Sequence, residues 1–344
     1  MGLSRIAVAL VAIVACAASA PAQDFRIEDV PSVTARPVAQ IKPLTILFSD
    51  RTQGDKADPG SGLIRFDDWA KRYPDRKQLL SLYPGYTEPE LIRRGSGRGT
   101  RTAKVKLTMY LAEARFVLHR VPTLDTLNRF TTLAVVEALD PAIKHRLIAP
   151  ADIVPRTDAK YAHNRNPARP WCTGAHVACL RSHYQLEGKL PIGIRLANKL
   201  RDASKKVAEY LEFESEIAIL APEQIARPDV MLLTGIDTPV VGALEQSTFY
   251  VNQVLQFAKF LAIVQVHPAD ANKAVVTAFT SLAIESKVLN TKKEYARVPV
   301  LRNLVPLQVL MGKSSFNTGN SISAGLPKYA RSRIQAIARV LDGD

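Results

Sequence analysis

The feature that most constrains the fold is a pair of long strand-forming runs joined by a short turn. Residues 257–266 and 274–288 are rich in β-branched and aromatic side chains, which favour the extended, pleated backbone. Residues 267–270, His-Pro-Ala-Asp, have the composition of a turn. Two such runs around so short a connection predict an antiparallel hairpin, so the chain should contain an antiparallel sheet.

Further strands are predicted on both sides of this hairpin. Residues 105–111 alternate between apolar and polar side chains, which is the period of a half-buried strand, and this strand should continue or bend into 114–121. Residues 44–48 are the best strand in an otherwise irregular N-terminal region. Residues 300–311 should form the next strand after the hairpin.

A helix is predicted where apolar residues recur at helical spacing over 124–138. Thr123 and Asp125 are suited to cap its N-terminus. The pair Asp140-Pro141 should end this helix, because proline cannot continue it, and should start a short second helix through His145.

The two longest amphipathic stripes predict helices over 192–211 and 327–341. In the C-terminal one, apolar residues share one side and basic residues occupy the rest. The apolar set is Tyr329, Ile334, Ile337 and Leu341, and the basic set is Lys328, Arg331, Arg333 and Arg339. Folding this helix back on antiparallel strands buries both apolar surfaces. The predicted fold class is α+β, with antiparallel strands and amphipathic helices, including a C-terminal helix packed on the sheet.

The N-terminus has the regions of an export signal. One positive charge precedes the apolar run 6–15, and small residues follow it. The A-x-A pattern ending at Ala22 predicts a signal peptide over 1–22, cleaved to release a periplasmic or secreted chain. The alternative is a lipobox ending at Cys16, whose lipidated cysteine would anchor the protein to a membrane. No later run has the ~20 apolar residues of a membrane-spanning helix, so none is expected in the mature chain.

Cys172 and Cys179 remain after removal of this leader, and an oxidising compartment predicts a disulfide between them. Seven residues of helix would hold their Cα atoms ~10.5 Å apart, whereas a disulfide needs less than ~7 Å. The segment should therefore be a loop that bends at Gly174. A zinc site formed by the two cysteines with His176 and His183 is the alternative. Their spacing would place the four side chains in a line along one helical face, whereas zinc needs four ligands that converge on one point, so no metal is predicted.

A length of 344 residues allows one large domain or two ordinary ones. After the signal peptide we expect an N-terminal α+β region at 23–150, a basic disulfide-bearing loop at 151–185 and a C-terminal α+β region at 186–344. One continuous domain over 23–344 is the alternative.

The common short catalytic motifs are missing, among them the nucleophile elbow Gly-x-Ser-x-Gly and the metalloprotease pattern His-Glu-x-x-His. Carboxylate chemistry is the remaining catalytic option, with Glu212, Glu214 and Glu216 or Glu245 and Glu285 as candidates. Alternating glutamates are more typical of the solvated side of an extended segment. The protein is therefore expected not to be an enzyme and to use no cofactor.

Charge is the more informative feature, with a formal net charge of +14. One basic cluster lies among glycines that free the backbone amides. Its members are Arg93, Arg94, Arg98, Arg101, Lys104 and Lys106. Outside the cytoplasm such a surface attracts anionic lipid or another anionic envelope polymer. Aromatic residues are only 7% and are not interleaved with the cluster, which argues against nucleic acid. A merely soluble basic surface is the alternative.

Residues 314–325 form a polar run before the last helix. Phe316, Asn317, Asn320 and Ile322 are candidates for a gate over a cavity between the strands and this helix, with a solvated connector as the alternative. The order of antiparallel strands, glycine-bearing loop and C-terminal amphipathic helix is similar to that of helix-grip lipid-binding domains of the START type. This similarity covers about the last third of the chain and rests on architecture, without a residue motif.

These observations favour an exported cell-envelope protein that binds an anionic or lipid-like ligand without catalysing a reaction. Two alternatives stay open. One is an exported hydrolase with a carboxylate-based or unrecognised site, and the other is an assembly or scaffold component of the envelope.

Overall fold

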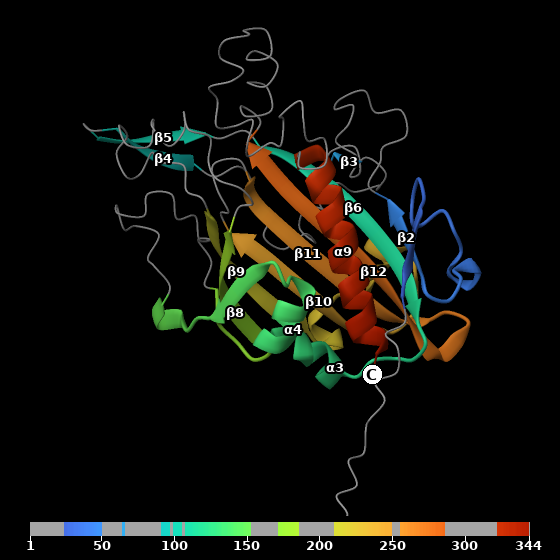
Figure 1. Ribbon diagram of the computed structural model, residues 1–344. Coiled ribbons are helices and arrows are strands. Elements are labelled where there is room, and N and C mark those ends of the chain that lie inside the picture. The colour runs from blue at the N-terminus through green and yellow to red at the C-terminus, as the bar shows by residue number, and fades with distance from the viewer. Residues whose placement is uncertain are drawn as a thin grey trace, which may run out of the picture.

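The computed structural model describes residues 24–49, 64–65, 91–96, 99–104, 107–152, 171–185, 210–249, 255–285 and 322–343. Its main element is a ten-stranded sheet in the order β1-β2-β6-β12-β11-β10-β9-β8-β7, with β3 also paired to β6 (Figure 1). Its strands are β1 (Arg26–Asp29), β2 (Thr45–Ser49), β3 (Ile64–Arg65), β6 (Leu107–Leu118), β7 (Ile143–Leu147), β8 (Val177–Gln185), β9 (Tyr210–Leu220), β10 (Val240–Phe249), β11 (Leu255–His267) and β12 (Asp270–Glu285). Strands β4 (Leu91–Ser96) and β5 (Gly99–Lys104) form a separate hairpin.

The central hairpin confirms the feature on which the fold prediction rests. Strands β11 and β12 pair antiparallel over their length, and Pro268-Ala269 turns between them. The other pairings of the described strands are also antiparallel, apart from the parallel pair β1 and β2. The predicted strands at 44–48 and 105–121 are confirmed as β2 and β6. The strand predicted at 300–311 lies outside the described residues.

The short helix predicted through His145 is wrong, because this segment is strand β7. After Asp140 the chain makes one turn, in which the amide of Ile143 donates to the Asp140 carbonyl at 2.9 Å. Residues 143–147 then pair with β8. Local composition is a weak guide to strands, since pairing with a neighbouring strand decides the outcome. Strand β8 likewise occupies 177–185, within the segment predicted as a loop.

The helix predicted over 124–138 is confirmed with an interruption. It consists of α3 (Leu124–Asn128), the 3₁₀ turn η2 (Arg129–Thr131) and α4 (Leu133–Leu139). The Thr123 side chain caps α3 by accepting from the amide of Thr126 at 3.1 Å. Helix α4 ends at Asp140, as predicted.

The helix predicted over 192–211 is wrong at its end, since Tyr210 and Leu211 begin strand β9. Residues 192–209 lie outside the described residues. Helix α6 (Arg227–Thr234) follows β9 in the sequence. It ends at Gly235, which has a positive φ of 66°. Glycine adopts this left-handed conformation without steric cost. Further single 3₁₀ turns are η1 (Val38–Gln40), η3 (Pro150–Asp152) and η6 (Pro222–Gln224).

The C-terminal helix α9 (Ile322–Asp342) packs on one face of the sheet, which confirms the predicted fold class (Figure 1). Its buried stripe meets the alternate residues of β6 that point to the same face. The stripe is Ala330, Ile334, Ile337, Ala338 and Leu341, and the β6 residues are Ala112, Ala114, Phe116 and Leu118. Burial of each large apolar side chain contributes about 1.5–3 kcal/mol.

The opposite face of the sheet is covered at one end by α6 and the turn after it. Arg115 on β6 donates to the carbonyl of Thr234, the last residue of α6. Gln265 on β11 donates to the carbonyl of Ile236 at 2.9 Å. Both side chains belong to the alternate set that points away from α9. The sheet therefore buries polar side chains on the face opposite the helix. No helix in the described parts of the chain is long and apolar enough to cross a membrane.

Candidate functional site

A buried arginine lies between α9 and the sheet, where the sequence predicted only apolar side chains. Arg333 is 6% exposed. Its Nη1 donates to the carboxylate of Asp140 and, at 3.1 Å, to the hydroxyl of Tyr329, while its Nη2 donates to the side-chain oxygen of Gln246. We call these four residues the Arg333 cluster. It joins α9, the end of α4 and strand β10.

The position of Arg333 follows from helical periodicity. It lies three residues after Ala330 and four before Ile337, so it belongs to the same stripe as the buried apolar residues. The prediction that placed Arg333 among the basic residues around that stripe is therefore wrong. Its pairing with Asp140 lowers the cost of removing the charge from water. Burial lowers the pKa of Arg333 to about 10, so the guanidinium stays charged at neutral pH.

The sheet below the Arg333 cluster presents one aromatic ring flanked by polar side chains. The Phe260 ring centroid on β11 lies 5.9 Å from the guanidinium carbon of Arg333. Phe260 stands directly opposite Gln246 on β10 and Thr280 on β12. Gln246 also donates to the hydroxyl of Ser215 on β9 at 3.3 Å. The Thr280 hydroxyl is buried and has no hydrogen-bond partner among the described residues.

This arrangement suits an acceptor group next to an apolar wall. A guanidinium carries five N–H donors in a rigid plane and binds carboxylate and phosphate oxygens through two parallel hydrogen bonds. A hydroxyl can donate or accept beside it, and the ring offers an apolar surface. The Arg333 cluster with Phe260 and Thr280 is the candidate functional site.

Three of the candidate glutamates, Glu214, Glu216 and Glu245, lie on the opposite face and are bound by other groups of the protein. Glu245 is bound by Lys259 at 2.6 Å, and both side chains are buried. Glu214 is bound by Arg181 through two guanidinium nitrogens. The alternating glutamates are thus on an extended strand, as predicted, but the expectation of a solvated side is wrong for Glu216, which is 7% exposed. The side chains of Glu212 and Glu285 lie outside the described part.

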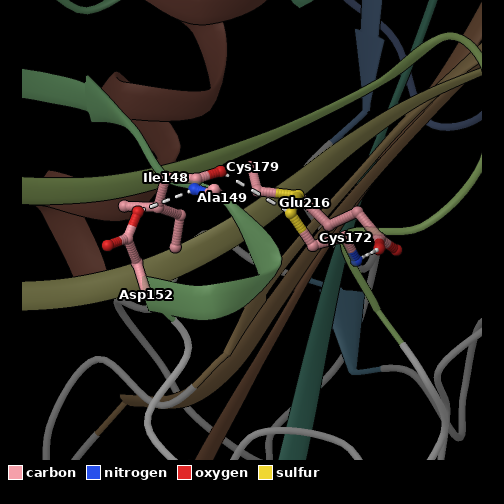
Figure 2. Close-up of a disulfide and its surroundings, with 6 residues drawn as sticks. All are labelled: Ile148, Ala149, Asp152, Cys172, Cys179 and Glu216. Atoms are coloured by element: carbon pink, nitrogen blue, oxygen red, sulfur yellow. Dashed lines mark hydrogen bonds between the residues drawn. A yellow bond between two sulfur atoms is a disulfide. The ribbon is translucent and has the colours of Figure 1, made fainter.

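The predicted disulfide between Cys172 and Cys179 is confirmed, with Cα atoms 5.5 Å apart. Figure 2 shows how it ties its loop to the sheet. Cys179 on β8 stands directly opposite Glu216 on β9, and the amide of Cys172 donates to the Glu216 carboxylate at 2.5 Å. The amide of Ile148 donates to the Cys179 carbonyl at 2.9 Å. Both sulfurs are used in the disulfide, so the alternative zinc set with His176 and His183 does not form.

The loop closed by the disulfide turns through left-handed backbone conformations. Gly174 has a φ of 107°, in agreement with the predicted bend, and Cys172 and His176 have φ values of 62° and 60°. Residues with a Cβ adopt this region at a cost, so tertiary contacts must hold them there. Buried Trp171 packs with Ile148 and Cys179 over the disulfide and supplies such contacts.

The predicted basic cluster falls on the β4–β5 hairpin instead of an irregular connection. Arg93 and Arg94 are in β4, and Arg101 and Lys104 are in β5. Arg94 stands directly opposite Arg101 in the register. Arg98 and Lys106 lie outside the described residues. The register therefore places two of the six residues directly opposite each other.

The predicted gate falls mostly outside the described residues, which exclude Phe316, Asn317 and Asn320. Ile322 is the first residue of α9, so this member of the set belongs to the helix.

No family model matches the sequence, and no curated protein matches it. Three solved structures that align with the chain are an aromatase/cyclase, a norcoclaurine synthase and human STARD10. The ZhuI aromatase/cyclase from Streptomyces sp. R1128 has a TM-score of 0.31 and 8% identity, over 68% of this chain and 92% of that chain. The truncated norcoclaurine synthase from Thalictrum flavum has a TM-score of 0.28 and 8% identity, over 62% and 98%. For human STARD10 these values are 0.26 and 8%, over 70% and 81%. Likenesses this weak carry no inference about function.

Proposed function

We propose that the protein is an exported, non-enzymatic binder of an amphiphile with an anionic head group. The head group lies at Arg333, and the apolar part of the ligand lies along Phe260. The observation that carries this proposal is the set of hydrogen-bond donors that Arg333 retains while it is buried.

The donors of Arg333 are only partly used within the protein. Asp140 and Tyr329 accept from Nη1, and Gln246 accepts from Nη2. The Nε–H and the second Nη2–H have no partner among the described residues. Nε and Nη2 lie on the side of a guanidinium that can bind a carboxylate with two hydrogen bonds. Arg181 uses the same two nitrogens, Nε and Nη2, to bind Glu214 in this protein.

The surroundings of Arg333 favour an acceptor that also brings apolar surface. Small apolar side chains flank Phe260 on the α9 face, namely Ala258 and Ala262 on β11 and Ala278 on β12. Thr280 adds a buried hydroxyl one strand away from Phe260. A formal net charge of +14 raises the local concentration of anions around the molecule. An anionic amphiphile meets all three conditions.

Export and the anionic surface complete the proposal. The leader pattern over 1–22 and the disulfide both support a periplasmic or secreted chain, since disulfides persist in oxidising compartments. The basic cluster from Arg93 to Lys106 binds anionic lipid or envelope polymer and brings the ligand site to its source. The segment with Phe316, Asn317, Asn320 and Ile322 gates access to the site.

Calorimetric titration with laurate and with lauryl alcohol tests the ligand site. Two variants form a matched pair: Asp140→Asn, and Asp140→Asn combined with Arg333→Gln. They differ only in the guanidinium. Because Asp140→Asn leaves the buried Arg333 without its carboxylate, circular dichroism must first show that both variants are folded. Asp140→Asn should bind laurate at least as tightly as wild type, because it removes a nearby negative charge. The double variant should lose about tenfold or more, since a bond to a charged group contributes about 1.5–3 kcal/mol.

Arg339→Gln is the control on the same helix, because Arg339 is exposed and Asp24 is its one ion-pair partner among the described residues. It should leave laurate binding unchanged. Equal affinity for laurate and lauryl alcohol, or unchanged laurate binding in a folded double variant, would refute a role of Arg333 as head-group ligand.

Co-sedimentation with acidic and with neutral vesicles tests the basic cluster. Each cation near an acidic surface contributes about 1 kcal/mol, screened beyond ~8–10 Å. Binding should therefore require acidic vesicles, weaken with salt and fall sharply when Arg93, Arg94, Arg98 and Arg101 are together changed to Ser. Binding that ignores lipid charge, or that survives the fourfold change, would show that the cluster is only a soluble surface.

A further inference from the structure

Strand β7 ends the ten-stranded sheet, and only one of its sides is paired. It pairs with β8 from Ile143 opposite Tyr184 to Leu147 opposite Leu180. No strand within the described ranges pairs with its outer side. An unpaired strand side offers a row of backbone donors and acceptors to another extended chain.

The register shows which backbone groups of β7 face outward. The amide of Ile148, just beyond the strand, donates to the Cys179 carbonyl, which marks this position as a hydrogen-bonded pair. Hydrogen-bonded and non-hydrogen-bonded pairs alternate along antiparallel strands. Arg146 and Lys144 therefore bond to β8, whereas the N–H and C=O groups of His145 and Leu147 point to the open side.

The open strand carries cations without partners. Lys144 and Arg146 are exposed, and neither side chain has a hydrogen bond or ion pair to another described residue. Arg146 also stands directly opposite Arg181, an arrangement of like charges that destabilises a sheet. Glu214 pairs with Arg181, so Arg146 is the one of these two cations that has no acidic partner among the described residues. Leu147, on the other face of β7, is 51% exposed.

The other end of the sheet is different. On β1, Glu28 is bound by Arg36 at 2.5 Å and Asp29 is bound by Arg331 at 2.6 Å. The two acidic side chains of β1 are thus both paired with cations of the protein. Arg26 on β1 has no side-chain partner among the described residues, so β1 presents one unpaired cation where β7 presents two.

We propose that β7 binds an acidic extended segment of a partner protein, which adds to the sheet as a further strand. Backbone hydrogen bonds from His145 and Leu147 hold the segment, and its acidic side chains pair with Lys144 and Arg146. Pairing of β7 with a second copy of itself would bring these cations together, which disfavours self-association. This interaction is independent of the ligand site at Arg333.

The test uses a fluorescently labelled peptide of alternating Glu and Val, and the full chain, with anisotropy as the readout. Two further peptides serve as comparisons: alternating Lys and Val, and the Glu-Val peptide with every second amide N-methylated. Wild type should bind the Glu-Val peptide at least about tenfold more tightly than either, because one comparison peptide has the wrong charge and the other cannot complete the strand.

Leu147→Pro removes one outward N–H and leaves the bonds to β8 in place, since proline is tolerated on the open side of an end strand. It should weaken binding about tenfold, whereas the matched Leu147→Thr should change it less than about threefold. The variant Lys144→Glu with Arg146→Glu changes only exposed side chains and should reverse the preference toward the Lys-Val peptide. Equal binding of the N-methylated peptide by wild type, or an unchanged preference in the charge-reversed variant, would overturn the proposal.

Discussion

The buried pair of Lys259 and Glu245 gives the sharpest prediction about stability. The Nζ of Lys259 lies 2.6 Å from a carboxylate oxygen of Glu245, and their side chains are 0% and 10% exposed. Lys259 stands between Ser247 and Ser281 in the register, so its cross-strand neighbours are neutral. Removing the charge of Lys259 leaves the buried carboxylate of Glu245 without this ion pair.

The change Lys259→Met removes the ammonium and keeps most of the side-chain volume. Breaking one side of a buried ion pair costs about 3–5 kcal/mol, because the remaining charge has lost its partner. The double variant Lys259→Met with Glu245→Gln removes both charges. It should cost only about 1–2 kcal/mol, since a buried amide with incomplete hydrogen bonding remains. Adding Glu245→Gln to Lys259→Met should therefore raise the free energy of unfolding above that of the Lys259→Met single variant.

Urea denaturation followed by circular dichroism measures the free energy of unfolding of wild type, both single variants and the double variant. A coupling energy of about 2 kcal/mol or more between the two positions is expected. A loss below about 1 kcal/mol for Lys259→Met, or a double variant no more stable than that single one, would refute the reasoning.

Three further outcomes are expected. Changing Cys172 and Cys179 together to Ser should lower the free energy of unfolding by about 2.5 kcal/mol in the chain-entropy model, and free alkylation of both thiols in the unreduced protein would contradict the disulfide. If the protein is exported as proposed, N-terminal sequencing should show cleavage after Ala22, unchanged by Cys16→Ser; loss of processing in that variant would support the lipobox instead. Burial lowers the pKa of His145, so the unfolded chain binds more protons as the pH falls below about 6.5, and stability should decrease there. Urea denaturation should show a smaller decrease for His145→Gln, and an equal decrease would contradict this origin.

The strands with strong local patterns could be predicted from the sequence. The β11–β12 hairpin and β6 combine strand-forming residues with either a short turn or a period of two, so local and tertiary preferences agree. Strand β7 has no such pattern. Its five residues become a strand because β8 lies beside them, and the sequence of 143–147 does not carry that information.

The candidate site could not be predicted for a related reason. The partner of Arg333 is Asp140, 193 residues earlier in the chain, and the pair exists only after α9 packs against the end of α4. Arginine on an amphipathic helix is most often solvated, so its residue type argued for the polar side. Arg333 lies three residues after Ala330 and four before Ile337, and this helical spacing was the signal that it belongs to the buried stripe. The disulfide was predictable because both partners lie within seven residues.

The sheet buries cations on both faces, and their hydrogen bonds distinguish two roles. On the face opposite α9, Glu245 binds Lys259 directly, and Glu214 binds both Nε and Nη2 of Arg181. Carboxylates of the protein pair with these two cations, whereas buried Arg115 on the same face donates to the Thr277 hydroxyl and the Thr234 carbonyl. Arg333 differs, because Asp140 binds it only through Nη1 and leaves the Nε side to other acceptors. The proposed ligand supplies an acceptor for this Nε side, so loss of binding without loss of fold should be sought at Arg333 first.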